Sequence, residues 1–217
     1  MKYYSIKTHD SDIKLEYIDN YIIHEKIKIK LFNTKNKIAK VEDWDILKKK
    51  YNSFEYIYTS NKKYNICKLS PISRSYFKLC EILHDCLIHN KINNTLCMAD
   101  APGGFIQYLS GQKLSNNIYI NTLISSDSSV PDWNLKHLKL NNIIYTHNSK
   151  NNGDLLNINV VKDIIENIKP CDLITADGGI DFTQDYNNQE YNSYSLIYSE
   201  IFLALNTQID KGSFIIK

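Results

Sequence analysis

The chain has 217 residues, of which 43% are hydrophobic, and its 26 basic and 24 acidic side chains leave a formal net charge of +2. This length and apolar content suit one domain of ordinary size with a buried core. The sequence contains no run of about 18 apolar residues, which speaks against a membrane span. Its first residues, MKYYSIKTHDSD, lack the apolar stretch of a secretory signal. We therefore expect no membrane partner.

The five cysteines argue against both a disulfide framework and a zinc site. Their number is odd, no two of them form a C-x-x-C pair, and no histidines cluster near them. Such cysteine usage is typical of a reducing compartment. We therefore expect no metal site and a cytoplasmic location.

Charge is distributed unevenly along the chain. Basic residues exceed acidic residues in residues 1–90, and the balance is reversed in residues 91–217. A basic segment attracts polyanions such as nucleic acids, and a solvated lysine-rich face produces the same pattern. Charge alone leaves both interpretations open.

The second part of the chain alternates between strand-like and helix-like segments. Short apolar runs that are rich in β-branched residues predict strands at 95–100, 117–125, 142–147, 171–177 and 212–217. Apolar residues at helical spacing predict helices at 104–112, 157–168 and 191–209. The alternation predicts an α/β fold with an open, mostly parallel, Rossmann-like sheet and helices on both faces. The continuous apolar runs predict strands that are buried on both faces.

An amphipathic helix is predicted before the first strand, over residues 70–90. Ser70 or Ser73 is the expected N-cap, and Pro71 suits the first turn. A further helix is expected within residues 41–60, and the segment before it gives no assignment.

A glycine pair follows the first predicted strand, in the segment Asp100-Ala101-Pro102-Gly103-Gly104. Ligands of open α/β sheets bind beyond the carboxyl ends of the strands, so Asp100 is expected to face a ligand that the glycine backbone can approach closely. The helix that follows offers free N–H groups and a positive dipole end. A tight turn without a ligand is the alternative.

The patterns that this segment lacks narrow the class of ligand. It contains neither G-x-G-x-x-G nor G-x-x-x-x-G-K-[ST], which disfavours a nucleotide-dependent oxidoreductase and a triphosphate site. An acidic residue and a glycine turn without a phosphate-binding lysine suit a ligand that has a cationic amine and no phosphate. S-adenosylmethionine fits that description.

Two more carboxylates follow predicted strands. Asp177 precedes Gly178 and Gly179, and Asp154 follows the strand before it. Unpaired acids repel one another, so a cluster of them is unsuitable as a stabilising device. We therefore expect these two carboxylates and Asp100 to face one crevice.

At these residues the sequence resembles the FtsJ-like RNA ribose 2'-O-methyltransferases, most closely the cap-specific branch and its relatives from large DNA viruses. Four segments carry the resemblance: DAPGGF at 100–105, GDL at 153–155, LITADGG at 173–179 and SRSYFKL at 73–79. The resemblance implies S-adenosylmethionine as the cofactor. The cofactor-binding residues that it implies are Ser73, Asp100, Ala101, Pro102, Gly103, Gly104, Phe105, Gly153, Asp154 and Asp177.

The same family uses a Lys-Asp-Lys-Glu tetrad in catalysis. Lys78, Asp177 and Lys217 match its first three members, which implies that they are catalytic. The glutamate and the family's last strands have no counterpart, because the sequence stops at Lys217. We therefore expect an N-terminal extension at 1–65, which serves RNA or cap binding or packing, and a methyltransferase domain at 66–217 that is incomplete at its C-terminus.

The chemistry requires a group that accepts or orients a proton, because a ribose hydroxyl is a poor nucleophile at neutral pH. A neutral lysine can accept the proton, and a second cation nearby lowers the pKa of that lysine. The sequence hypothesis makes Lys217 the base and Lys78 the neighbouring cation, with both lysines held in place by Asp177.

The resemblance thus implies S-adenosylmethionine-dependent methylation of an RNA ribose 2'-hydroxyl, at the 5' cap of mRNA rather than in ribosomal RNA. Expected partners are capped RNA and capping-complex proteins, in the cytoplasm, the viral factory or the virion of a large DNA virus. The alternative is a catalytically inactive scaffold that binds RNA or a capping partner. Tyr186, Tyr191 and Tyr194 are candidates for stacking on RNA bases, with packing as their alternative role.

Overall fold

The computed structural model describes residues 24–38, 40–44, 47, 67–86, 92–134, 142–179 and 189–217. Contacts divide the chain into two units, Met1–Tyr64 and Asn65–Lys217. In the first unit, helix α1 spans Glu25–Ile38 and buries none of its residues. Most of the helix expected within residues 41–60 lies outside the described residues.

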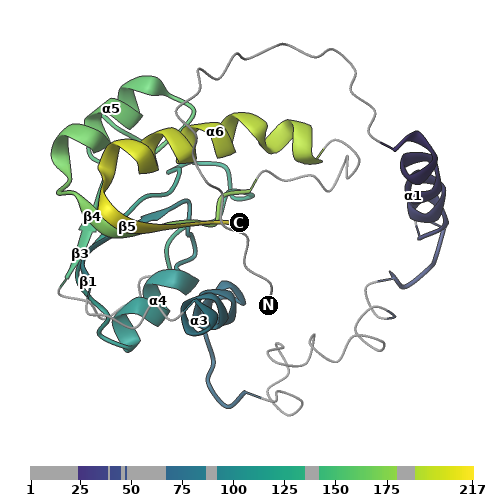
Figure 1. The fold of residues 1–217 in the computed structure, drawn as a ribbon, viewed down its shortest axis with the longest axis horizontal. Coiled ribbons are helices and arrows are strands. Elements are labelled where there is room, and N and C mark those ends of the chain that lie inside the picture. Colours follow the sequence, from purple (N-terminus) through teal and green to yellow (C-terminus); the bar gives the residue numbers. More distant parts are fainter. Residues whose placement is uncertain are drawn as a thin grey trace. The chain divides into compact units, whose positions relative to one another are not determined.

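The second unit is built on a sheet of five parallel strands (Figure 1). Their order across the sheet is β3-β2-β1-β4-β5, so the first strand in the sequence is central. Each of the five predicted strands is present, which confirms the predicted α/β class. The strands are β1 (Ile92–Met98), β2 (Ser115–Ile120), β3 (Ile143–Tyr145), β4 (Cys171–Ala176) and β5 (Gln208–Ile216).

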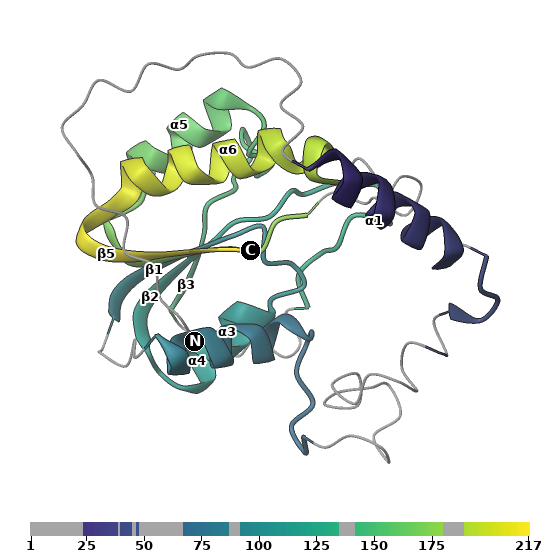
Figure 2. The ribbon, with the colours of Figure 1, turned by 45° about the vertical axis from the view of Figure 1, so that its right-hand side comes forward.

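Helices cover both faces of this sheet. Figures 1 and 2 show α3 (Ser75–Asp85) and α4 (Gly104–Gly111) on one face, and α5 (Ile158–Asn167) and α6 (Gln189–Thr207) on the other. Each face therefore has its own apolar cluster. No helix among the described residues has the length and apolarity needed to cross a bilayer.

The burial of strand β1 on both faces explains why its sequence does not alternate between apolar and polar residues. Leu96 and Met98 pack into the cluster under α5 and α6, whereas Cys97 packs into the cluster under α3 and α4. A strand that is covered on both faces has a near-continuous apolar run rather than an alternating pattern. The prediction of burial on both faces is correct for this central strand and wrong for the edge strands β3 and β5, whose residues are partly buried or exposed.

Helix α3 begins later than predicted. Its N-cap is Arg74, and no side chain caps it. The Oγ of Ser73 lies 2.5 Å from the Oγ of Ser75, so this hydroxyl pairs with a side chain rather than with a backbone N–H. The predicted serine cap is therefore wrong, whereas the predicted apolar face is confirmed by the buried Leu79 and Leu83.

Gly104 allows α4 to pack closely against the start of α3. A Cβ at Gly104 would overlap the side-chain oxygens of Ser73 and Ser75 and would lie 2.9 Å from the backbone nitrogen of Tyr76. This glycine of the pair therefore serves contact between two helices. Gly111, at the other end of α4, has open space where its Cβ would be.

We predict opposite effects of alanine at the two glycines of α4. Gly104→Ala should lower the free energy of unfolding by about 1–3 kcal/mol, because the added methyl group overpacks the α3–α4 contact. Gly111→Ala should raise it by up to about 1 kcal/mol, because alanine is the better helix former. Urea unfolding of the two variants measures both effects, and equal stability of the two proteins would contradict the close helix contact.

Candidate active site

A cleft of about 590 Å³ lies at the carboxyl ends of the strands. The order of the strands changes direction between β1 and β4, and open α/β sheets bind ligands at such a switch point. The segments after β1, β2, β3 and β4 and the side of α6 all contribute to the cleft. Its lining residues are Ala99, Ala101, Asn121, Thr122, Leu123, Ser129, Val130, Pro131, Gly153, Asp154, Leu155, Leu156, Asp177, Gly179 and Leu196.

Only part of the predicted cofactor-binding set lines this cleft. Ala101, Gly153, Asp154 and Asp177 do so. The predicted residues that do not line it are Ser73, Asp100, Pro102, Gly103, Gly104 and Phe105. Most of the predicted residues of the first glycine turn, at 100–105, thus do not line the cleft, which is formed by segments that follow four different strands.

Asp100 is buried beneath the start of α4 and does not line the cleft. Its two carboxylate oxygens accept hydrogen bonds from the N–H groups of Phe105 (3.1 Å) and Ile106 (3.0 Å), and the residue is 2% exposed. Burial raises the pKa of Asp100 to about 8, although these two N–H groups favour the ionised form. The expectation that Asp100 faces the ligand is therefore wrong, because this side chain occupies the N–H groups at the start of α4 that the ligand was expected to use.

The turn between β1 and α4 contains two residues with left-handed backbone. Gly103, the N-cap of α4, has a φ of 110°, a region that glycine enters freely. Ala99 has a φ of 51° and lines the cleft. A non-glycine residue in this region stores backbone strain, and such strain concentrates at functional sites. The sequence carried no signal for Ala99.

Gly153 brings the loop before α5 against the end of β2. Its φ is 79°, and a Cβ there would overlap the carbonyl oxygen of Thr122. The side-chain N–H of Asn121 donates to the carbonyl oxygen of Gly153 at 3.2 Å. The other side-chain atom of Asn121, Oδ1, is buried without a hydrogen-bond partner among the described residues. Asn121, which lines the cleft, therefore has an unused acceptor.

Strand register brings Asp177 and Lys217 together. The N–H of Asp177 donates to the carbonyl oxygen of Met98 at 3.2 Å, and the N–H of Lys217 donates to that of Ala176 at 3.1 Å. The two residues thus follow neighbouring parallel strands at the same edge of the sheet. The Nζ of Lys217 forms an ion pair with Oδ1 of Asp177.

Lys78 belongs to the same cluster, although it comes from α3. Leu79 anchors that part of α3 in the core. Partial burial lowers the pKa of Lys78, the positive charge of Lys217 lowers it further, and Asp177 opposes the shift. The three residues that match the family's tetrad therefore interact electrostatically, as one Lys-Asp-Lys cluster.

A fourth titratable group, Glu200, lies beside this cluster and was missed in the sequence. It comes from the buried face of α6 and is 1% exposed. Its position in an apolar helix matches no motif, so the sequence held no signal for it. The described residues contain no group of three histidine, cysteine or acidic side chains that could hold a metal ion.

Comparison with known proteins identifies relatives of this chain. The family model of FtsJ-like methyltransferases matches residues 71–217. A solved structure described as a ribosomal RNA methyltransferase from Plasmodium falciparum is 20% identical to the chain and superposes with a TM-score of 0.48. That superposition covers 66% of this chain and 76% of the other.

Curated relatives come from African swine fever virus. "Probable methyltransferase EP424R" of a Warthog/Namibia isolate is 25% identical over 165 residues, which cover 67% of this chain and 39% of the viral protein. The same protein of a Pig/Kenya isolate is 23% identical over 167 residues, with the same coverage. This chain therefore spans about two fifths of the length of these relatives.

We predict that Ala99→Gly stabilises the protein. Glycine enters the left-handed region without the cost of about 1–2 kcal/mol that an L side chain incurs, so part of that amount should appear in the free energy of unfolding. Ala99→Val should destabilise the protein, because a β-branched residue fits this region poorly.

The matched control is Ala176→Gly, at the end of the neighbouring strand β4. Ala176 is buried in extended backbone, so glycine there should destabilise the protein by about 0.5–1 kcal/mol or more. Urea midpoints of the three variants give the comparison. Loss of stability in Ala99→Gly would refute the strain at Ala99.

Proposed function

Because the chain belongs to the FtsJ-like methyltransferase family, we propose that it transfers the methyl group of S-adenosylmethionine to the 2'-hydroxyl of an RNA ribose. The observation that carries this proposal is the Lys-Asp-Lys cluster. The Asp177–Lys217 ion pair belongs to residues that follow β4 and β5, Asp177 also lines the cleft, and Lys78 lies within electrostatic reach of both.

The lining of the cleft suits S-adenosylmethionine. It includes the carboxylates of Asp154 and Asp177 and the unpaired, buried Oδ1 of Asn121, and it includes no lysine or arginine among the described residues. Such a lining favours a cationic ligand without phosphates over a nucleotide. When bound, the cofactor supplies a methyl group that its sulfonium already activates. We propose that Gly153 and Asp154 bind its adenosine end, as the family resemblance implies.

The two lysines differ in what surrounds them. Lys217 is paired with the carboxylate of Asp177, so it is the charged partner. The pKa of Lys78 is lowered by burial and by Lys217, which favours the free amine. We therefore propose that Lys78 accepts the proton of the ribose hydroxyl and that Lys217, held by Asp177, is the neighbouring cation. This assignment reverses the roles in the sequence hypothesis.

RNA as the substrate is supported by the start of α6. This helix precedes β5 and runs antiparallel to it, so it begins over the end of the sheet where the strands reach the cleft (Figure 2). Tyr191 and Tyr194 are 82% and 65% exposed there. Exposed aromatic rings stack on unpaired bases. We propose that they contact the RNA strand, and that the strand is the capped 5' end of mRNA.

The organisation of the chain completes the proposal. Residues 66–217 would form the methyltransferase domain, and residues 1–65 an extension that contacts the RNA or its cap. Capping proteins would be the partners, in the cytoplasm of a cell infected by a large DNA virus. The rival function, an inactive scaffold, predicts RNA or protein binding without methyl transfer.

The experiment that tests the function combines calorimetry with a transfer assay. We predict that the chain binds S-adenosylmethionine and not a nicotinamide dinucleotide, and that it transfers labelled methyl groups to the ribose 2'-oxygen of capped RNA. Uncapped RNA of the same sequence is the control for cap recognition. Cofactor binding with no transfer to either RNA would favour the scaffold.

A second prediction separates the roles of the lysines. Lys78→Arg should lower kcat by at least about 100-fold, because arginine cannot become a neutral base, and general bases contribute about that much. Lys217→Arg keeps the cation beside Asp177 and should retain most of the rate. Both variants should bind the cofactor as the wild type does.

The pH dependence should follow from the same assignment. For wild type, kcat should rise with pH until Lys78 is deprotonated, at a pH below the ordinary lysine range because its pKa is lowered. Loss of activity in Lys217→Arg with full activity in Lys78→Arg would return the role of base to Lys217.

A further inference from the structure

Glu200 is packed against the turn that carries Asp177. A Cβ at Gly178 would overlap Oε1 of Glu200 and would lie 2.9 Å from the side chain of Leu196. The carboxyl group of Glu200 therefore touches the residue directly after Asp177, where any side chain other than hydrogen would displace it. The second glycine pair thus makes room for this carboxyl group from α6.

The surroundings of Glu200 are energetically unfavourable for a buried carboxyl group. Neither carboxylate oxygen makes a hydrogen bond of regular geometry with a described residue. A buried polar group in this state destabilises a protein unless another gain offsets the cost. The polar groups that act on it are the Gly178 N–H, Asp177 and Lys217, all of which belong to the site or its turn.

From this packing we infer that Glu200 is a positioning residue, whose buried carboxyl group supports the Gly178 turn and so keeps Asp177 in contact with Lys217. The inference rests on the proposed function only for its kinetic consequence. Its structural content concerns the α6–turn contact alone. The role differs from that of a group that touches substrate, because Glu200 is buried and does not line the cleft.

The protonation state of Glu200 can be used to test its contact with Gly178. Burial raises its pKa to about 7, from an ordinary value of 4.5. This net value includes the Gly178 N–H, which lowers the pKa, the negative charge of Asp177, which raises it, and the positive charge of Lys217, which lowers it. No charged side chain of the neighbouring α5 is among these causes. Glu200 therefore titrates in the neutral range while it touches Gly178.

The kinetic test compares two replacements of Glu200. Glu200→Gln keeps the shape and a polar oxygen in contact with Gly178, so kcat for methyl transfer should remain within a few-fold of the wild-type value. Glu200→Leu keeps the bulk and removes the polar oxygens beside the turn, so kcat should fall by at least about 10-fold as Asp177 is displaced. The Kd for S-adenosylmethionine and the KM for RNA should change little in both.

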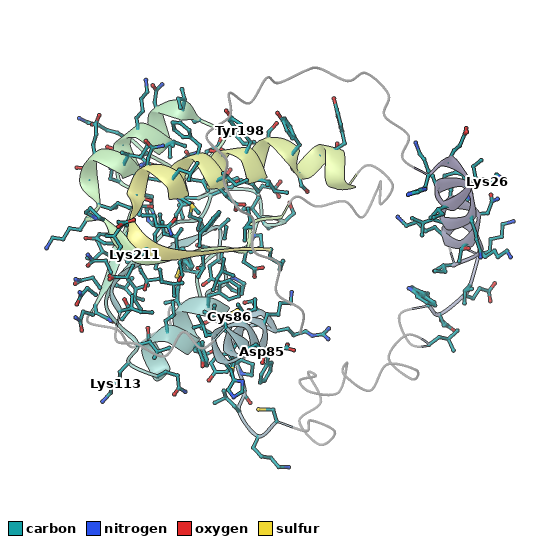
Figure 3. The ribbon with its side chains drawn as sticks, viewed as in Figure 1. Lys26, Asp85, Cys86, Lys113, Tyr198 and Lys211 are labelled. Carbon is teal, nitrogen blue, oxygen red and sulfur yellow. The ribbon has the colours of Figure 1, made fainter. Side chains whose placement is uncertain are left out.

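The matched control is Tyr198→Leu, on the outer side of the same helix, where the tyrosine is 64% exposed (Figure 3). This variant should keep the wild-type kcat. Equal kcat values for wild type and Glu200→Leu would overturn the inference. A Glu200→Gln variant as impaired as Glu200→Leu would overturn it too, because the amide preserves the contact.

A second readout does not need the methyl transfer reaction. The amide resonance of Gly178 in wild type should shift with an apparent pKa near 7, and this shift should be absent in Glu200→Gln. If wild type transfers no methyl group, the proposed function fails, and the resonance alone decides the inference. A Gly178 amide that titrates identically in both proteins overturns it.

The pH dependence of the free energy of unfolding should report the same titration of Glu200. A carboxyl group with a raised pKa contributes most to the free energy of unfolding below pH 4.5, and that contribution is lost as pH rises through about 7. The stability of wild type relative to Glu200→Gln should therefore fall across this window. A difference between the two proteins that is independent of pH would contradict the buried, touching carboxyl group.

Discussion

The parallel pairing of β4 with β1 on one side and with β5 on the other is the constraint on which the site depends. It sets the main-chain hydrogen bonds of Asp177 and Lys217, and it leaves the two side chains at one edge of the sheet, where they form an ion pair. A slip of one residue between β4 and β5 would turn Lys217 to the opposite face of the sheet. The apolar core on both faces of the sheet holds the register. The geometry of the Asp177–Lys217 pair is thus a product of core packing.

Each of the two glycine pairs makes room for a close contact with a helix, and the two contacts lie on opposite faces of the sheet. Gly104 lets α4 meet the start of α3, the helix that carries Lys78, and Gly178 lets the carboxyl group of Glu200 on α6 meet the turn that carries Asp177. Each pair thus includes one glycine whose missing side chain allows a close contact with a helix or with the segment at its start.

Periodicity in the sequence was sufficient to predict the layers of the fold, because strands covered on both faces and helices with one apolar face have distinct patterns. The resemblance to a family was needed to join Lys78 with Asp177 and Lys217. Asp100 was misjudged, because an acid between a strand and a helix can face a ligand or cap the helix, and only the path of the turn decides. Glu200 and Ala99 were missed, because burial beside a turn and a left-handed backbone leave no local pattern.

The central claim, that the Asp177–Lys217 pair organises methyl transfer, is tested most directly by Asp177→Asn. Transfer of labelled methyl groups from S-adenosylmethionine to RNA is measured for wild type and variant, with cofactor binding measured by calorimetry in parallel. The account predicts transfer by wild type, and loss of at least about 100-fold in kcat for the variant with the cofactor still bound, because the amide cannot hold the Lys217 ammonium group as the carboxylate does. A variant that methylates RNA at the wild-type rate would contradict it.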